Sequence, residues 1–269
     1  MDIYEILEKI NQYFPVSPEQ YIKDYVDKVQ KTILNCYEKE EYQTAHFHIY
    51  LLFMTYIYLV VYQTRTLYPK EHLLVIEYIR TYNNHDKDLY NIDKIFDYSK
   101  VLDSEILKVL ALIDIDKSMI GKYKGASKNR DPMAHATGYY VINTQDEFET
   151  KTSILLDYFE EINNKLLHVF KDYYLSAITE EVNVDNFVKI YLFEKLNMTN
   201  SEYGFLENMK TKKLGENIIE RHSEVLENIL SNLCETEPIY ESQSYHKEYR
   251  AGNVKYEKCS NVEKCKDMY

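Results

Sequence analysis

Apolar residues recur at three- and four-residue intervals over most of the chain, which is the spacing of amphipathic helices. The first clear case begins at Pro18, where Ser17 suits the cap and Pro18 the first helical position. Its apolar positions are Tyr21, Tyr25, Val29, Ile33 and Cys36. A second helix is predicted from Thr44 to Leu67, apolar on nearly all sides and therefore central. A third is predicted from Pro69 to Tyr82.

Helical spacing continues beyond the polar link "NNHDKD", which reads as a loop. Residues 89–112 are predicted to be helical, with a break at "LDSE" where Asp103 or Ser104 would cap a new start. The clearest long helix is predicted from Gln145 to Tyr174. Its apolar stripe consists of Phe148, Leu155, Phe159, Ile162, Leu166, Val169 and Tyr173.

The domain organisation follows from where these patterns weaken. Six Gly and five Pro in 269 residues leave few turn signals, so long helices are favoured over a many-turned β fold. Weaker helical segments around 187–193 and 214–233 predict a helical extension over residues 177–234. The last 35 residues contain only four Ile, Leu, Val or Met residues, which predicts a polar, poorly packed tail over 235–269. Residues 1–176 would form the main helical domain.

Targeting signals do not stand out. The beginning "MDIYEILEKINQYF" lacks the basic-then-apolar order of a secretory signal. The most apolar run, "IYLLFMTYIYLVVY" at 49–62, has 14 residues, fewer than the roughly 20 that span a bilayer. We therefore expect a buried core helix, a cytoplasmic protein and no membrane partner.

Cysteine and histidine residues give little sign of a metal site. The four cysteines are too sparse for a disulfide framework, so reduced thiols are expected. Cys259 and Cys265 with His246 could supply three zinc ligands, but their spacing is not that of a zinc knuckle and no fourth ligand is evident. His46 and His48 point about 200° apart on their helix and do not share a metal. One is expected to be buried and the other to face a groove.

Positive charge gathers in one stretch, "KSMIGKYKGASKNRDPMAHATG", of a chain whose formal net charge is -12. Its basic residues, with no acidic residue among them, are Lys117, Lys122, Lys124, Lys128 and Arg130. Gly121 and Gly125 indicate a loop or a frayed helix end. A short helix is expected to begin at Pro132, with Asn129 or Asp131 as its cap.

The residues around that expected helix start suit phosphate chemistry. Asp131 and His135 would be one turn apart, where a carboxylate can orient or charge an imidazole. The free N–H groups of a helix start, together with Arg130 and the lysines, would bind an anion. A His can move the proton of an RNA 2′-OH while an Arg stabilises the pentacoordinate phosphorus. RNA would then be cut to a 2′,3′-cyclic phosphate and a 5′-OH, and DNA would be excluded.

The sequence "NRDPMAH" closely resembles the R-x4-6-H motif of HEPN domains, with Asp131 as the polar residue after the Arg and Ala134 before the His. The helical pattern from about Pro18 to Tyr174 is consistent with this resemblance. It implies a HEPN-like helical bundle with additional C-terminal helices, within an all-α fold. It also implies that Arg130 and His135 are catalytic and Asp131 supports them. In HEPN toxins inactivated by a nucleotidyltransferase, a Tyr stands where this chain has Thr137, so that regulation is not implied.

The resemblance further implies a metal-independent endoribonuclease without cofactors that cuts single-stranded RNA or tRNA loops, as a homodimer. Such proteins act as toxins or in phage defence, so an antitoxin or an activating protein is an expected partner. The residues expected to bind RNA are Lys117, Lys122, Lys124, Lys128 and Asn129. Two alternatives remain: a non-catalytic HEPN-like module that binds RNA or protein, and a helical interaction protein in which Arg130 and His135 only cap a helix.

Overall fold

The computed structural model describes residues 2–83, 92, 94–134, 142–180, 183–209, 215–236, 245–250 and 253–258. Within these ranges only the backbone is described for 80–83, 127–134, 235–236 and the last two segments. The chain forms two compact units, Met1–Ile229 and Leu230–Tyr269.

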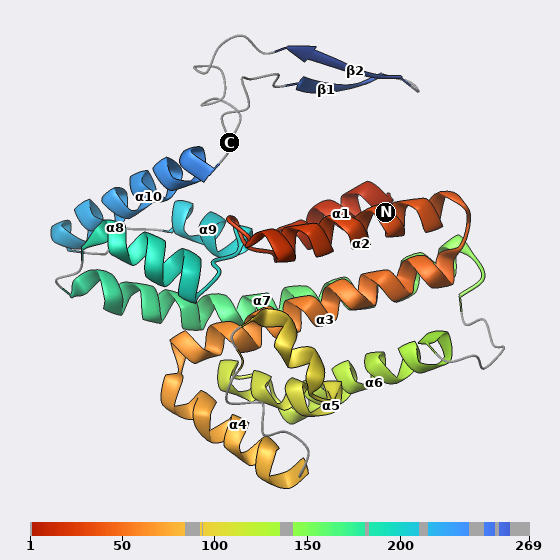
Figure 1. Ribbon diagram of the computed structural model, residues 1–269, viewed down its shortest axis with the longest axis horizontal. Helices are drawn as coiled ribbons and strands as arrows, with labels where there is room; N and C mark the ends of the chain where they lie inside the picture. The colour runs from red at the N-terminus through yellow and green to blue at the C-terminus, as the bar shows by residue number, and fades with distance from the viewer. Residues whose placement is uncertain are drawn as a thin grey trace. The chain divides into compact units, whose positions relative to one another are not determined.

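The described part of the first unit consists of helices joined by short links (Figure 1). The α-helices are α1 (Ile3–Asn11), α2 (Gln20–Glu38), α3 (Tyr42–Leu67), α4 (Pro69–Asn83), α5 (Asp103–Ile106), α6 (Lys117–Ala134), α7 (Gln145–Thr179), α8 (Val184–Asn186), α9 (Asn200–Glu207) and α10 (Glu216–Thr236), whose last residues belong to the second unit. Two 3-10 segments, η2 (Ile95–Lys100) and η3 (Leu107–Ile113), flank α5, and a π-helical segment, η4 (Phe187–Lys195), follows α8.

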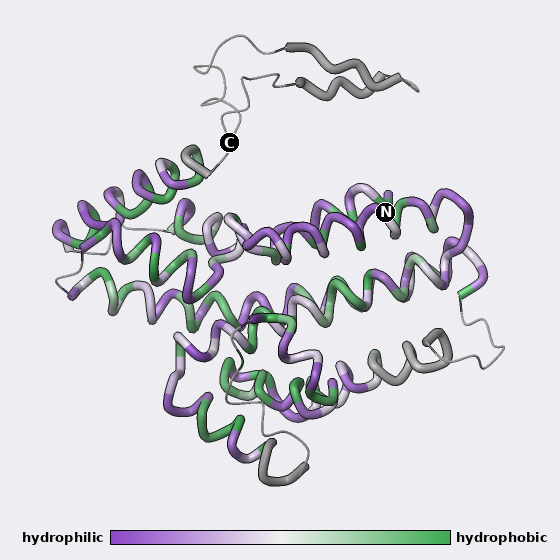
Figure 2. Tube along the Cα trace, viewed as in Figure 1, coloured by the Kyte–Doolittle hydropathy of each residue, from purple (hydrophilic) through white to green (hydrophobic). Residues whose placement is uncertain are grey.

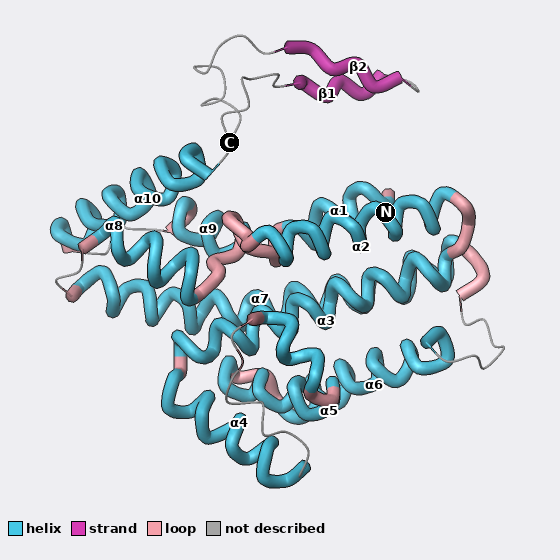
Figure 3. Tube along the Cα trace, viewed as in Figure 1, coloured by secondary structure: helices cyan, strands magenta, loops and turns pink. Residues whose placement is uncertain are grey.

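The prediction of an all-α fold is confirmed for the described residues of the first unit, which are drawn as helix and loop throughout (Figure 3). Hydrophobic and hydrophilic positions alternate turn by turn along most of its helices (Figure 2). The second unit adds a two-stranded antiparallel sheet of β1 (Tyr245–Arg250) and β2 (Asn253–Lys258). This hairpin lies in the segment for which the sequence predicted a polar, poorly packed tail.

Helix α3 is the centre of the bundle. It packs against α2 and α7 along much of its length and also contacts α4, α5 and α6 (Figure 1). By length and composition α3 is the one helix among the described residues that could cross a membrane, but 78% of its most apolar window is buried inside the protein. The run at 49–62 is therefore a core helix, as predicted.

Tyrosine rings take part in the packing of the core. The ring of Phe159 on α7 lies 5.1 Å from that of Tyr13, 5.3 Å from that of Tyr56 and 5.2 Å from that of Phe53. Such aromatic contacts add about 0.5–1.5 kcal/mol beyond the burial of their area. The abundance of tyrosine in the sequence, with no tryptophan, thus has a packing role.

Several predicted helix bounds agree closely with the structure. The helices predicted at 44–67, 69–82 and 145–174 correspond to α3, α4 and α7. The helix predicted from Pro18 begins at Gln20, so Glu19 takes the cap position that the sequence assigned to Ser17. Residues 95–113 are helical with a break at the predicted place, but the cap of α5 is Leu102 and not Asp103 or Ser104, and the segment forms short 3-10 and α turns instead of long helices. The predicted loop at 83–88 lies outside the described residues except for Asn83.

The segment after α7 is joined to the beginning of the chain. The backbone N–H of Val16 donates to the carbonyl of Met198 at 2.9 Å, and the side-chain amide of Asn200 donates to the carbonyl of Phe14 at 3.0 Å. The boundary proposed at 176/177 falls inside α7, and residues 177–229 belong to the same compact unit as 1–176.

The apolar faces of the two longest helices are buried inside the bundle. Long apolar faces such as those of α3 and α7 could in principle form a dimer interface. Most apolar residues of α3 and α7 are instead buried in the core. Helix α4 carries the most exposed large apolar side chain among the described residues, Leu74, at 72% exposure, next to Leu73.

Candidate functional site

The basic stretch forms a single helix, not the predicted loop followed by a short helix. Helix α6 begins at Lys117 and continues through Gly121 and Gly125 to Ala134. An ideal Cβ atom at either glycine would meet nothing within 4 Å, so nothing in the surrounding packing requires glycine at these places. Two glycines cost a helix roughly 1 kcal/mol each relative to alanine, which the packing of α6 against its neighbours can offset.

This corrects the expected anion site at Pro132. Pro132 lies in the last turn of α6, so Asn129 and Asp131 are interior positions of α6 and not caps of a new helix. The C-terminal end of a helix presents carbonyl groups and carries partial negative charge. An anion at this end must therefore be held by side chains, because free backbone N–H groups are at the other end, near Lys117.

The predicted RNA-binding residues all lie on α6 but divide between two sides of it. At about 100° per residue, Lys117, Lys124 and Lys128 fall within about 40° of one another. Lys122 lies at least about 120° away from Lys124 and Lys128, on the side of Gly125 and Ala126. The predicted RNA-binding residues therefore do not form one continuous patch on α6.

Helix α6 is anchored against α7 by Tyr123. Its side chain is fully buried, and its hydroxyl donates a hydrogen bond to Oε2 of Glu161 at 3.1 Å. The rings of Tyr123 and Tyr158 are 4.9 Å apart, edge to face. Burial raises the pKa of Tyr123 well above its usual range, and the nearby Glu161 carboxylate acts in the same direction.

The proposed catalytic residues stand at the end of this anchored helix. Arg130 and Asp131 belong to α6, with Arg130 two turns beyond Tyr123, or about 10 Å along the axis. Only their backbone is described. His135 directly follows α6 and lies outside the described residues. The roles of Arg130, Asp131 and His135 remain predictions.

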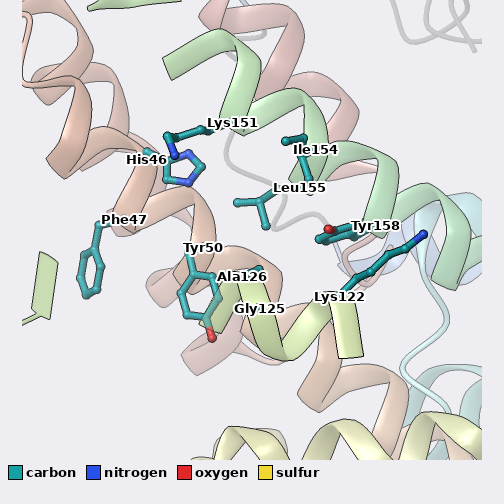
Figure 4. Close-up of a pocket in the computed structure, with 10 residues that line it drawn as sticks. All are labelled: His46, Phe47, Tyr50, Lys122, Gly125, Ala126, Lys151, Ile154, Leu155 and Tyr158. Atoms are coloured by element: carbon teal, nitrogen blue, oxygen red, sulfur yellow. The ribbon is translucent and has the colours of Figure 1, made fainter. Parts of the chain in front are cut away.

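A pocket of about 250 Å³ lies where α6 meets α3 and α7 (Figure 4). We call it the α3/α6/α7 pocket; its wall includes His46 and Tyr50 from α3, Lys122 and Gly125 from α6, and Lys151 and Tyr158 from α7. Lys151 lies beside His46 at one end, and Lys122 lies beside Tyr158 at the other (Figure 4). None of the described side chains that line the pocket is acidic.

His46 is the buried histidine that the sequence predicted, and it also borders the pocket. Its Nδ1 shares a hydrogen bond of 3.2 Å with Oγ1 of Thr152. Burial lowers the pKa of His46 to about 4, and the charge of Lys151 acts in the same direction, so the ring is neutral at neutral pH. His48 is half-buried and donates from Nδ1 to the carbonyl of Thr44 at 2.8 Å.

Sequence reasoning missed the contribution of α3 and α7 to this pocket. Lys151 follows the pattern of an exposed helix position, and nothing in the local sequence places it beside His46. The pattern "HFH" predicts that one histidine faces a groove, but it does not indicate which helices form that groove.

Within the described ranges, no group of three or more His, Cys, Asp or Glu side chains is placed to hold a metal ion. Cys259 and Cys265 lie outside those ranges, and only the backbone of His246 is described.

Comparison with known proteins finds no match: no family model, no curated protein and no solved structure matches this chain. Its function is therefore inferred from its own residues and their geometry.

Proposed function

We propose that the protein is a metal-independent endoribonuclease of the HEPN type that cuts single-stranded RNA or tRNA loops. One observation supports this most: the motif that begins at Arg130 lies at the end of a basic helix whose preceding turns are fixed in the core of a helical bundle. Tyr123 holds that helix two turns before Arg130. Arg130 and Asp131, which belong to that helix, are positioned more precisely than they would be on a loop.

The proposed reaction needs a proton carrier and a positive charge. His135 takes the proton from the 2′-OH, and the 2′ oxygen attacks the adjoining phosphorus. The bond from phosphorus to the 5′ oxygen breaks, the departing oxygen takes up a proton from the solvent, and His135 then releases its proton to the solvent. Arg130 stabilises the extra negative charge on phosphorus, and Asp131 orients the imidazole. The products are a 2′,3′-cyclic phosphate and a 5′-OH, so DNA is not a substrate.

The distribution of charge would bring RNA to this site. Lys117, Lys122, Lys124 and Lys128 would attract RNA locally, while the overall charge of -12 would keep nucleic acid away from other surfaces. From the resemblance we also propose a cytoplasmic homodimer acting as a toxin or phage-defence effector, restrained or activated by a partner protein.

A second candidate function is RNA binding without cleavage. The α3/α6/α7 pocket favours it, because the cationic and aromatic side chains of that pocket need neither Arg130 nor His135 to bind RNA. The two functions predict different results for wild type and His135→Ala. A nuclease would cut RNA as wild type, and its variant would bind RNA without cutting it. A binding module would bind RNA in both forms and cut it in neither.

Cleavage of a mixed tRNA and mRNA pool in EDTA tests the proposal. We would compare wild type, Arg130→Ala, His135→Ala and the control His168→Ala, which changes an exposed histidine on α7. We expect wild type and the control to leave 2′,3′-cyclic phosphate ends, and the two motif variants, still folded by circular dichroism, to be slower by at least about 100-fold.

Other outcomes would point elsewhere. Equal cleavage by His135→Ala would refute the assignment of the catalytic residue. If wild type binds the RNA pool but cuts none of it, the binding module is the better description.

A further inference from the structure

We propose that the α3/α6/α7 pocket binds one nucleotide unit of single-stranded RNA, with its base beside Gly125 and its flanking phosphates near Lys151 and Lys122. This deepens the proposed function and rests on it, because RNA is taken as the ligand. The pocket is separate from the motif residues, and it would hold the strand next to them.

The shape of the pocket suits a flat ring. On the α6 side the wall is made of Gly125 and Ala126, and a Cβ atom at Gly125 would meet nothing within 4 Å. On the α7 side the wall is apolar and aromatic, with Leu155 buried and Tyr158 half-buried. A base can stack on such a surface, and each stacked base contributes enough to change affinity about fivefold or more.

The charges suit a nucleotide inside a strand. Lys151 and Lys122 lie at opposite ends of the pocket (Figure 4). Positions 151 and 158 of α7, which mark these two ends, are about 10 Å apart along the helix axis. A nucleotide within a strand has a phosphate on each side of its sugar, so it can use both cations, whereas a ligand with a single anionic group uses one. The described lining residues include no carboxylate that would repel it.

The direction of α6 joins the pocket to the motif. Helix α6 runs antiparallel to α3 and α7, so its later residues approach the beginnings of those helices (Figure 1). Position 130 comes one turn after Ala126 and within about 40° of it around the helix. Arg130 is therefore placed beyond the Lys151 end of the pocket. A strand seated in the pocket would continue toward Arg130.

Binding of a fluorescein-labelled, 2′-O-methylated RNA decamer, followed by anisotropy, tests the proposal without cleavage, because the 2′-OH is blocked. Gly125→Leu fills the pocket, and Gly121→Leu is its matched control, one turn earlier on α6 and outside the pocket wall. We expect the dissociation constant to rise about tenfold in Gly125→Leu. It should rise less than about twofold in the control.

A second pair of variants tests the charge. Lys151→Gln removes a pocket cation, and Lys171→Gln removes an exposed lysine from the same helix. Loss of one phosphate contact should reduce the slope of log K against log salt concentration by about 0.7 for a single strand. A purely structural role of Lys151 would leave that slope unchanged.

The outcomes separate this inference from the proposed function. If Gly125→Leu and Lys151→Gln bind the decamer as their controls do, or if wild type does not bind it, the pocket is not the RNA site, whatever the cleavage assay shows. If the variants weaken binding but wild type cuts no RNA, the pocket assignment stands and the nuclease proposal fails. If AMP or UMP alone binds as tightly as the decamer and with the same sensitivity to Gly125→Leu, the occupant is a free nucleotide, which overturns the assignment to RNA.

Discussion

Glu202 lies at a buried junction between α9 and the centre of the bundle. Its side chain is fully buried, and its Oε2 accepts hydrogen bonds from the backbone N–H of Thr199 at 2.7 Å and from Nε2 of Gln63 at 3.0 Å. Its Oε1 accepts no hydrogen bond from any residue that the structure describes. Burial raises the pKa of Glu202 from 4.5 to about 7, although these hydrogen bonds oppose the rise.

This pKa makes stability depend on pH. Between about pH 4.5 and 7 the folded state holds a proton that the unfolded state has released. The stabilisation from that proton is complete below about pH 4.5 and is lost as the pH rises through about 7. At 1.36 kcal/mol for each pH unit of difference between the two pKa values, the free energy of unfolding falls by about 3 kcal/mol across this window.

Glu202→Gln replaces the carboxyl with a neutral group of the same shape. We would measure the free energy of unfolding in urea at several pH values from 4.5 to 8 for wild type and variant. Any fixed cost of the new amide is the same at every pH, so it cancels from the pH dependence. We expect the free energy of unfolding of the variant to fall by about 3 kcal/mol less than that of wild type over this pH range. The stability of the variant relative to wild type should therefore increase as the pH rises.

An exposed glutamate on η4, Glu194, provides a matched control for this experiment. Glu194→Gln removes one negative charge from this exposed position and is the control for the change of net charge. His46, whose pKa burial also shifts, is common to all three proteins, so its effect cancels. Parallel curves for Glu202→Gln and wild type would refute the reasoning, since Glu202 would then be ionised at the same pH in the folded and unfolded chains.

Two further predictions concern α6. Tyr123→Phe removes the hydroxyl that donates to Glu161 and should lower the free energy of unfolding by about 1 kcal/mol in urea titrations; a variant as stable as wild type would show that this hydrogen bond is not what anchors α6. Gly121→Ala places a methyl group in open space in the middle of α6 and should raise the free energy of unfolding by about 0.5–1 kcal/mol by the same measurement, whereas a loss would contradict the helical conformation.

Elements with long, regular apolar spacing could be predicted from the sequence. Helix α3 is so uniformly apolar that only a central place in the bundle can bury it. The apolar stripe of α7 includes Phe159, whose ring packs in the core. Both signals are strong because burial of many side chains at helical spacing outweighs local preferences.

Helix α6 shows where local signals mislead. Two glycines and a proline indicated a loop and a new helix start, yet α6 is continuous from Lys117 to Ala134. Ile120 and Tyr123 pack into the core, and tertiary packing of this kind overrides weak helix propensity. The same error misplaced the expected anion site, because the direction of a helix determines which of its ends has free N–H groups.

The sequence by itself determined the helical class, the positions of the main helices and the motif that suggests a ribonuclease. These depend on residues close together in the chain, whose spacing is fixed by the geometry of a helix. The tertiary structure alone decided that His46, Lys122 and Lys151 share one pocket and that Glu202 is buried beside Gln63. Such groupings join residues far apart in the chain, and only the packing of whole helices against one another brings them together.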